Sequence, residues 1–226
     1  DCLRHSRPGT RVTAILPDAL RSGPRYRAWR QQVAALCRVE RISLLGQFDP
    51  DVDVDVWSVD ATTGFRTAPT SRTAWFPAPP REVQTVEDFF AVSVGPLVPY
   101  REPLRGPSVP AIFPKGLPAW TVLRSATAQR QYSGPTATPP FVVVRRTSRP
   151  GDRPRAIATT IACTSPVVVE NHLLVLTPRD GTLSSCRELM RTLKDPSTSE
   201  WLDARTRCRH LTVAALKCMP LSRKTR

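Results

Sequence analysis

The sequence has little glycine, no long apolar run and no signal-peptide pattern. Only 10 of its 226 residues are glycine, whereas 24 are proline, roughly double the usual share of about 5%, so we expect stiff loops. No apolar stretch approaches the roughly 18 residues that cross a bilayer as a helix, which excludes an integral membrane protein. Asp1 is followed by neither the basic nor the apolar region of a signal peptide, and the opening resembles the middle of a gene product.

The cysteines and histidines are too dispersed for a metal site or a hydrolase centre. No C-x-x-C pair occurs, the three histidines have no ligand spacing, and there is no G-x-S-x-G turn. We interpret the cysteines as reduced, mostly buried thiols of a cytoplasmic protein. They are Cys2, Cys37, Cys163, Cys186, Cys208 and Cys218.

An alternating acidic series has the spacing of calcium ligands but lacks the rest of the loop. Asp51, Asp53 and Asp55 match the first ligands of such a loop. However, Val56 stands where a sharp turn needs glycine, and Thr62 stands where a bidentate glutamate belongs. We therefore interpret the series as the acidic face of a half-buried strand, and we expect no metal.

The positive charge is concentrated in the second half of the chain. The formal net charge is +14: residues 1–119 hold 15 Lys+Arg against 12 Asp+Glu, and residues 120–226 hold 18 against 7. A basic half beside a near-neutral half favours a module that binds a polyanion. Because the excess is mostly arginine, whose planar fork suits phosphates and guanine edges, we predict a nucleic acid as the partner. A merely solvated basic surface is the alternative.

The apolar pattern predicts an α/β segment, a linker and an α+β domain. In the first segment, a helical stretch places Trp29 and Val33 on one face. Residues 64–81 are rich in proline and show neither the helical nor the strand period of apolar residues, so we predict the linker there. The expected strands of the first segment are 12–16, 39–45 and 52–59. Those of the α+β domain are 141–144, 156–162 and 167–176, and we expect them to form an antiparallel sheet. The expected helices after that sheet are 183–194, one opening at the capping-box pair Ser197 and Glu200, and one from Thr212 to Pro220.

Three groups of basic side chains are candidate DNA contacts. One lies on the proline-rich stretch 95–118, one brackets the loop between two expected strands, and one lies between two expected helices, where helix N-termini also favour phosphate. Glu170, Asn171 and His172 interrupt the apolar run 167–176 and are candidates for base reading or for structural hydrogen bonds. The candidates are Arg101 and Arg105; Arg145, Arg146, Arg149, Arg153 and Arg155; Asn171 and His172; and Arg207, Arg209 and His210, with Arg205 beside them.

Two blocks of the sequence together resemble one enzyme family. The first block comprises RVTAILP at 11–17, LRSGPRYRAWR at 20–30, LGQF at 45–48 and the strand 52–59; the second comprises PFVVVRRTSR at 140–149, VENHLLVL at 169–176 and residues 201–213. The first is similar to the second half of the catalytic sheet, and the second to the target-recognition domain, of the N6-adenine DNA methyltransferases of restriction-modification systems.

The resemblance implies a cofactor and a reaction that this chain alone does not support. In that family, a methyl group passes from S-adenosylmethionine to N6 of an adenine that is swung out of the duplex. The glycine-rich cofactor turn is absent, because no G-x-G occurs, and so is the Asn/Asp-Pro-Pro-Tyr/Phe catalytic turn. The segment Thr138-Pro139-Pro140-Phe141 lacks the side-chain carbonyl acceptor and precedes an expected strand. We expect S-adenosylmethionine in the complete enzyme and no cofactor on this chain.

One functional position carries over from the family to this sequence. Phe48 stands in the loop between the strands that correspond to the sixth and seventh, where the family has an aromatic residue that stacks on the flipped adenine. An aromatic face suits an unstacked base, with stacking worth about 1–3 kcal/mol. The alternative is a loop phenylalanine that closes the end of the core.

We therefore predict a partial doubly wound, Rossmann-like methyltransferase sheet at 1–63, a linker at 64–81 and an α+β DNA target-recognition domain at 82–226. Half a sheet would leave an unpaired strand edge, so we expect either a truncated gene product or a split enzyme that is completed by a separate cofactor-binding subunit. The expected partners are double-stranded DNA, a separate N-terminal methyltransferase subunit and a cognate restriction endonuclease, in a bacterial cytoplasm near the nucleoid. The alternative is a stand-alone DNA-specificity protein without methyltransferase activity; an endonuclease fused to a recognition domain is a third candidate.

Overall fold

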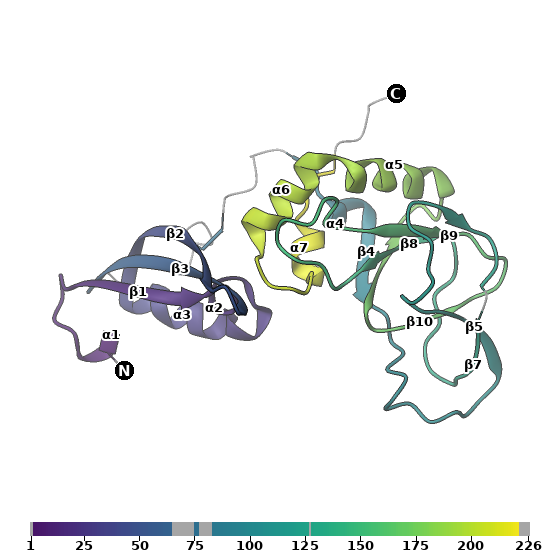
Figure 1. The fold of residues 1–226 in the computed structure, drawn as a ribbon, viewed down its shortest axis with the longest axis horizontal. Coiled ribbons are helices and arrows are strands. Elements are labelled where there is room, and N and C mark those ends of the chain that lie inside the picture. Colours follow the sequence, from purple (N-terminus) through teal and green to yellow (C-terminus); the bar gives the residue numbers. More distant parts are fainter. Residues whose placement is uncertain (1, 65–74, 77–82, 127, 222–226) are drawn as a thin grey trace. The chain divides into compact units, whose positions relative to one another are not determined.

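The protein is an α/β protein with antiparallel and mixed sheets and several helices (Figure 1). The computed structural model describes residues 2–64, 75–76, 83–126 and 128–221. Contacts divide the chain into two compact units: Asp1–Pro80 with Asp203–Cys208, and Arg81–Leu202 with Arg209–Arg226. Most of the predicted linker lies outside the described residues. The sequence assigned 203–208 to the second domain, whereas the structure places this segment in the first unit.

The first unit contains a three-stranded sheet in the order β1-β3-β2. Its elements are α1 (Cys2–His5), β1 (Arg11–Pro17), α2 (Asp18–Ser22), the 3-10 helix η1 (Pro24–Tyr26), α3 (Arg27–Leu36), β2 (Cys37–Asp49) and β3 (Val52–Thr63). Because β1 and β2 both pair antiparallel with β3, they run in the same direction. The chain crosses from β1 to β2 through α2, η1 and α3.

Helices cover one face of this sheet (Figure 1). Leu16 of β1 and Val59 of β3 belong to a core cluster with Trp29 and Val33 of α3, which confirms the predicted helix and its apolar face. On the other face of β1, Ile15 is 63% exposed, and the Thr13 hydroxyl donates to the Asp60 carboxylate of β3 (2.7 Å). The alternation of apolar and polar residues in β1 is thus explained by burial of a single face.

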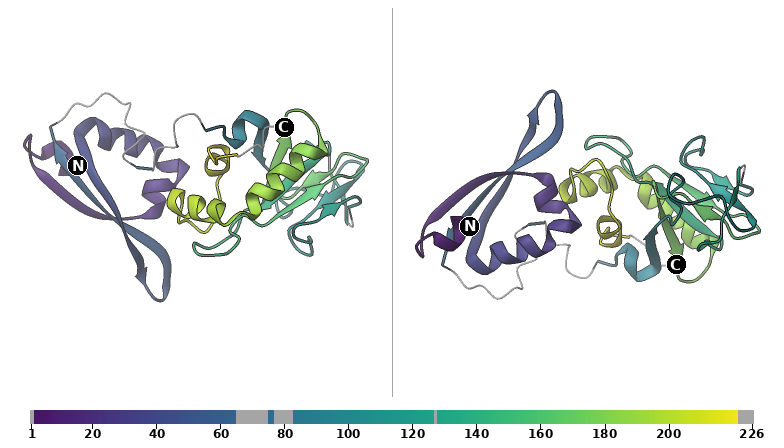
Figure 2. Two further views of the ribbon diagram at one scale, coloured as in Figure 1. Left: turned by 90° about the horizontal axis from the view of Figure 1, so that it is seen from above. Right: turned by 90° about the horizontal axis from the view of Figure 1, so that it is seen from below.

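The hairpin of β2 and β3 extends beyond β1 (Figure 2). Because β1 pairs with residues 56–62 of β3, the preceding residues of β3 have no neighbour in β1. We call residues 44–56 the β2–β3 arm. Both strands are longer than the sequence indicated, so Phe48 lies within β2, next to the end of the hairpin, rather than in an open loop. The register shifts around Gly46, whose φ of 104° is accessible to glycine without strain.

The second unit contains a five-stranded sheet in the order β4-β11-β8-β9-β6 and a three-stranded sheet in the order β10-β5-β7. The strands are β4 (Phe90–Val94), β5 (Ser108–Ile112), β6 (Val122–Leu123), β7 (Ala128–Gln131), β8 (Phe141–Arg145), β9 (Ala158–Ile161), β10 (Val168–Val169) and β11 (Leu173–Pro178). The helices are α4 (Val86–Phe89), α5 (Leu183–Lys194), α6 (Pro196–Arg205, whose last residues belong to the first unit) and α7 (Val213–Lys217).

The five-stranded sheet is buried on both faces, which explains its continuous apolar strands. In β8, Val142 and Val144 pack with α5 and α7 in one core cluster, whereas Phe141 and Val143 belong to a second cluster with Ile112 of β5. The sequence predicted a sheet of three antiparallel strands. The structure adds β4, which pairs antiparallel with β11, and β6, which pairs parallel with β9.

Two predictions made from local sequence patterns differ from the structure. The run 167–176 is split into β10 and β11, because Leu173 N–H donates to the Glu170 carbonyl (3.0 Å) and closes a turn. Helix α6 begins at Pro196 rather than after a Ser197 cap; the Asp195 carboxylate accepts from Ser197 N–H (2.9 Å). By contrast, the predicted helix 183–194 is confirmed to the residue, with the Thr182 hydroxyl accepting from Ser185 N–H (3.2 Å).

Candidate nucleic-acid interface

Three distant segments of the second unit are tied together by backbone hydrogen bonds just after β8. Arg146 N–H donates to the His172 carbonyl (2.9 Å), and the Arg146 carbonyl accepts from Leu211 N–H (2.8 Å). Ser148 N–H donates to the Arg209 carbonyl (2.9 Å). These bonds bring together residues that the sequence placed in three separate candidate groups. We call Arg146, His172, Arg209 and His210 the basic cluster.

The side chains of the basic cluster reach solvent from a fixed backbone. Arg209 and His210 are exposed and Arg146 is half-buried. The His172 side chain is 52% exposed, and its Nδ1 lies 2.6 Å from the carboxylate of Glu170, which is buried. This contact orients the imidazole and turns Nε2 away from Glu170. The cluster therefore presents hydrogen-bond donors to solvent, next to the buried Glu170 carboxylate.

The electrostatic environment lowers the pKa of His210 below its usual value. Burial is the largest cause, followed by the positive charges of Arg146, His172 and Arg209. The Thr147 hydroxyl lies 3.3 Å from Nδ1 of the same ring. A histidine in this setting is neutral at neutral pH and gains its charge only in mild acid.

The other predicted contacts on the loop after β8 divide into exposed and structural residues. Arg149 and Arg153 are exposed, at a turn in which the Asp152 carboxylate accepts from Arg149 N–H (2.7 Å). Arg145 uses its guanidinium to donate to the Leu117 carbonyl (2.8 Å). Arg155 is completely buried, and its N–H donates to the Ser199 hydroxyl (3.0 Å). We therefore leave Arg155 out of the candidate interface, because a buried guanidinium does not reach a ligand.

The proline-rich stretch carries an exposed loop that starts beside the turn before β11. Asn171 N–H donates to the Leu97 carbonyl (2.9 Å), so Asn171 has a structural role through its backbone. Arg130 fixes the loop that follows by donating to the carbonyls of Pro99 (3.0 Å) and Glu102 (2.7 Å). The predicted contacts on this loop, Arg101 and Arg105, are both exposed.

Sequence reasoning missed an aromatic residue on the same loop. Tyr100 is 75% exposed, and the Arg101 guanidinium lies 5.5 Å from the centre of its ring. An exposed ring beside an arginine is a common arrangement at nucleic-acid surfaces. The signal was present in the sequence, as a tyrosine directly before an arginine among prolines.

Arg207 does not join the basic cluster, although the sequence grouped it with Arg209 and His210. It belongs to the first unit, where its N–H donates to the Asp18 carboxylate (2.8 Å) and its guanidinium pairs with Asp55. Its neighbour Arg205 lies 4.5 Å from the centre of the Phe76 ring. Both arginines thus hold the segment 203–208 within the first unit.

Segment 203–208 contacts a buried ion pair of the first unit, which no sequence pattern predicted. Arg21 and Asp18 are each 2% exposed, and Arg21 Nε lies 2.8 Å from the Asp18 carboxylate. Arg21 also donates to the carbonyls of Trp75 and Ala204, both at 3.2 Å, and its guanidinium lies 4.0 Å from the centre of the Trp57 ring. An Asp–Arg pair three residues apart on a helix is usually exposed to solvent. The spacing of Asp18 and Arg21 in the sequence therefore does not indicate that the pair is buried.

Opposing effects set the pKa of Asp18. Burial raises it, but the charge of Arg21 and hydrogen bonds from Ser22, Arg207 N–H and Arg21 together lower it below its usual value. The carboxylate is therefore ionised at neutral pH and depends on its partners for stabilisation.

Phe48 is prominent on the β2–β3 arm. It is 68% exposed, and the nearby Val52 and Val54 are 41% and 39% exposed. Asp51 and Asp53 are exposed on the same arm. An exposed ring at this place excludes the alternative that Phe48 closes the core of the first unit.

No helix among the described residues is long and apolar enough to cross a membrane. Within the same residues, no group of three or more His, Cys, Asp or Glu side chains is placed to hold a metal ion. No protein-family model matches the chain, and no curated protein matches its sequence.

Proposed function

We propose that the second unit binds duplex DNA through the basic cluster and the exposed arginines of the loop after β8. The observation that carries this proposal is the convergence of four basic side chains from three segments whose backbones are hydrogen-bonded to one another. Arginine side chains on a fixed backbone lose less conformational freedom when they contact phosphates than those of a mobile segment, and arginine can also read guanine edges. The net charge of the second half of the chain supports a polyanion as the ligand.

A salt titration tests DNA binding by the complete chain. The affinity for a fluorescently labelled duplex would be measured by anisotropy between about 50 and 200 mM salt. If the cluster and loop contact three or four phosphates, the logarithm of the association constant falls against the logarithm of salt concentration with a slope of about −3. An affinity that does not change with salt would contradict phosphate contacts.

We further propose that the first unit is part of an adenine-N6 DNA methyltransferase. The crossover from β1 through α3 to β2 joins two strands that run in the same direction, as in a doubly wound sheet. Among the described residues, β1 pairs only with β3. Its other edge could continue into a sheet supplied by a separate N-terminal subunit, and a cognate restriction endonuclease would complete the system.

The first unit does not fit S-adenosylmethionine by itself. In doubly wound sheets, ligands bind beyond the carboxyl ends of strands, often on glycine-rich turns. Here β1 passes into α2 through Pro17, without a glycine, and the Asp18 carboxylate is occupied by Arg21, Ser22 and Arg207. The methyl donor would therefore be held by the N-terminal subunit.

Replacing Phe48 by alanine tests the role of the β2–β3 arm. The Phe48→Ala variant should bind duplex DNA within about twofold of the unaltered chain, because the DNA contacts lie in the second unit. It should reduce methylation by an enzyme reconstituted with an N-terminal subunit by about 10-fold or more, since stacking on an extruded base is worth about 1–3 kcal/mol. Methylation and binding are measured on the same duplex. Equal methylation by the variant and the unaltered enzyme would remove the proposed role of Phe48.

DNA affinity should also depend on the charge of His210. Burial and basic neighbours lower the pKa of His210. The ring is therefore neutral at about pH 7.5, and it becomes a cation only when the pH falls below the ordinary histidine pKa of about 6.5. The affinity should therefore increase between about pH 7.5 and 5.5, and the salt slope should steepen by about 0.9 for the added charge.

The His210→Gln variant is the matched control for this pH dependence. It should bind like the unaltered chain at about pH 7.5 and gain less affinity on acidification than the unaltered chain does. An identical increase in both proteins would show that His210 does not contact DNA.

The stand-alone DNA-specificity protein is the second candidate function. It is favoured by the absence of a cofactor turn after β1, because the second unit can bind DNA without a methyltransferase. The two candidates differ in one test: only the methyltransferase proposal predicts that an N-terminal subunit with the glycine-rich and Asn-Pro-Pro-Tyr motifs gains activity when this chain is added.

A further inference from the structure

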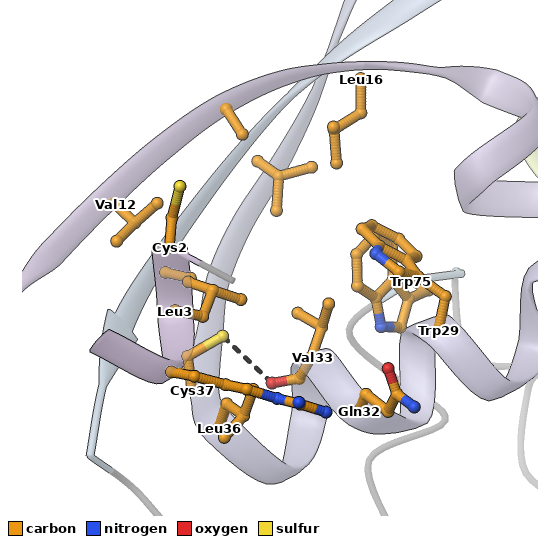
Figure 3. A pocket seen from close by; sticks show the side chains of 14 residues that line it. Cys2, Leu3, Val12, Leu16, Trp29, Gln32, Val33, Leu36, Cys37 and Trp75 are labelled. Atoms are coloured by element: carbon orange, nitrogen blue, oxygen red, sulfur yellow. Dashed lines mark hydrogen bonds between the residues drawn. The ribbon is translucent and has the colours of Figure 1, made fainter. Parts of the chain in front are cut away.

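Exposed apolar side chains of the second unit are concentrated on one loop of the proline-rich stretch. Tyr100 and Leu104 are 75% and 64% exposed, the highest values among the large apolar side chains described in that unit. Core packing does not explain them. By contrast, the half-open hollow between α3 and the sheet of the first unit (Figure 3) is lined mostly by members of that unit's core cluster, such as Trp29 and Trp75. We call residues 98–105 the Tyr100 loop.

Hydrogen bonds hold the backbone of this loop on both sides of the tyrosine. The Val98 carbonyl accepts from Arg101 N–H (2.9 Å) and from Glu102 N–H (3.0 Å), which closes the turn at the tip. The Arg130 guanidinium donates to the carbonyls of Pro99 (3.0 Å) and Glu102 (2.7 Å). The ring therefore projects into solvent from a fixed backbone, and it loses less conformational freedom on binding than a ring on a mobile loop would.

The Tyr100 loop leaves the core beside the basic cluster. Leu97, directly before the loop, is fully buried. Its N–H donates to the Val169 carbonyl (3.1 Å), and its carbonyl accepts from Asn171 N–H (2.9 Å). Asn171 in turn precedes His172 of the basic cluster. The loop and the cluster are thus anchored on the same turn before β11, and a ligand as long as a DNA duplex can contact both.

The side chains of the loop suit a nucleic acid. Arg101 and Arg105 are exposed, and each directly follows one of the two exposed apolar residues. The Arg101 guanidinium lies 5.5 Å from the centre of the Tyr100 ring. Because phosphates flank every base step, cations beside a planar apolar side chain match a duplex whose base stack admits that side chain.

We propose that the Tyr100 loop inserts its tyrosine ring between two stacked base pairs of the bound duplex and kinks the duplex at that step. Arg101 and Arg105 then contact phosphates on either side of the kink. Side-chain wedges kink DNA by about 20–90°, and the cost of unstacking is offset by the contacts that the bent duplex makes. The inference rests on the proposed DNA binding by the second unit, and it adds deformation of the DNA to that function.

A nicked duplex tests the wedge, because a break in one strand makes a kink at that step less costly. The affinity of the complete chain would be measured by anisotropy for a sealed duplex of about 20 bp and for the same duplex with one central nick, at one salt concentration. The unaltered chain should bind the nicked duplex about 5- to 10-fold more tightly. In Tyr100→Ala this preference should fall to less than about twofold, whereas Tyr100→Phe, which keeps a ring, should retain it.

Two controls separate the wedge from DNA binding in general. Tyr26→Ala makes the same change at a tyrosine of the first unit that is 41% exposed, and it should leave the preference unchanged. Replacing Arg146 and Arg209 by glutamine should weaken binding to both duplexes and leave the ratio of the two affinities within about twofold of its original value.

Energy transfer between dyes at the two ends of the sealed duplex measures the kink directly. It should increase when the unaltered chain is added to saturation and should not increase with Tyr100→Ala. Salt-dependent binding without a preference for the nick, a preference that Tyr100→Ala retains, or unchanged energy transfer with the unaltered chain would each overturn the wedge and leave DNA binding in place. The absence of binding to either duplex would contradict the DNA-binding function itself, and the wedge with it.

Discussion

Replacing Arg21 by methionine is expected to lower the free energy of unfolding of the first unit by about 3–5 kcal/mol. The substitution would leave the buried Asp18 carboxylate without its cation, and the carbonyls of Trp75 and Ala204 without the donor that bonds to both. Hydrogen exchange of the complete chain, read by mass spectrometry on peptides from β1 and β3, measures this loss locally. Protection of the peptides from α5 and β8 should be retained.

Two further variants separate the ion pair from a general effect of substitution. Arg25→Met makes the same change at an exposed position of η1 and should alter stability by less than about 0.5 kcal/mol. Adding Asp18→Leu to Arg21→Met should recover part of the loss, because a buried carboxylate that lacks its cation is then removed. Wild-type protection in Arg21→Met would show that the ion pair does not hold the first unit together.

Replacing Arg146 and Arg209 together by glutamine is expected to weaken duplex binding by about 10- to 100-fold at about 100 mM salt. Each arginine is expected to contact one phosphate, so the salt slope should become less steep by about 2. The backbone bonds of residues 146 and 209 do not depend on their side chains, and the fold should therefore be preserved. Anisotropy of a labelled duplex measures both quantities, and circular dichroism checks the fold.

The matched control removes the same charge from another surface of the second unit. Arg187 and Arg191 are exposed on α5, and their double substitution by glutamine should change the affinity by less than about threefold. If this control weakened binding as much as the Arg146 and Arg209 substitutions did, net charge rather than the basic cluster would account for DNA binding.

The sequence predicted those strands and helices whose formation depends mainly on neighbouring residues. The four apolar residues before Arg145 indicated a buried strand, and the apolar period of residues 183–194 indicated α5. The apolar run 167–176 was misleading, because its length fits one strand. The turn that divides it depends on a backbone bond to Glu170 and on the pairing of that residue with Leu97 across the sheet.

The candidate interface was predictable in composition but not in geometry. A run of arginines does not show which side chain is buried: Arg145 and Arg155 serve the fold, whereas Arg149 and Arg153 are exposed. The juxtaposition of Arg146 with 209–211 depends on long-range pairing that has no periodicity in the sequence.

The sequence also did not show that the basic group Arg205, Arg207, Arg209 and His210 is divided between the two units. Arg207 and Arg209 are two residues apart, yet one pairs with Asp55 in the first unit and the other belongs to the basic cluster in the second. Their separation follows from the buried Asp18 carboxylate, which binds Arg207 N–H and fixes the course of the backbone at this point.

The most direct test of the account is to observe which backbone amides respond to DNA. In a two-dimensional ¹H–¹⁵N NMR titration of the complete chain with a short duplex, the amides of residues 146–149, 172 and 209–211 should show the largest shift changes. Those of α5 and of the β2–β3 arm should change little. Changes concentrated on other elements, or no changes at duplex concentrations well above that of the protein, would contradict the claim that the basic cluster contacts DNA.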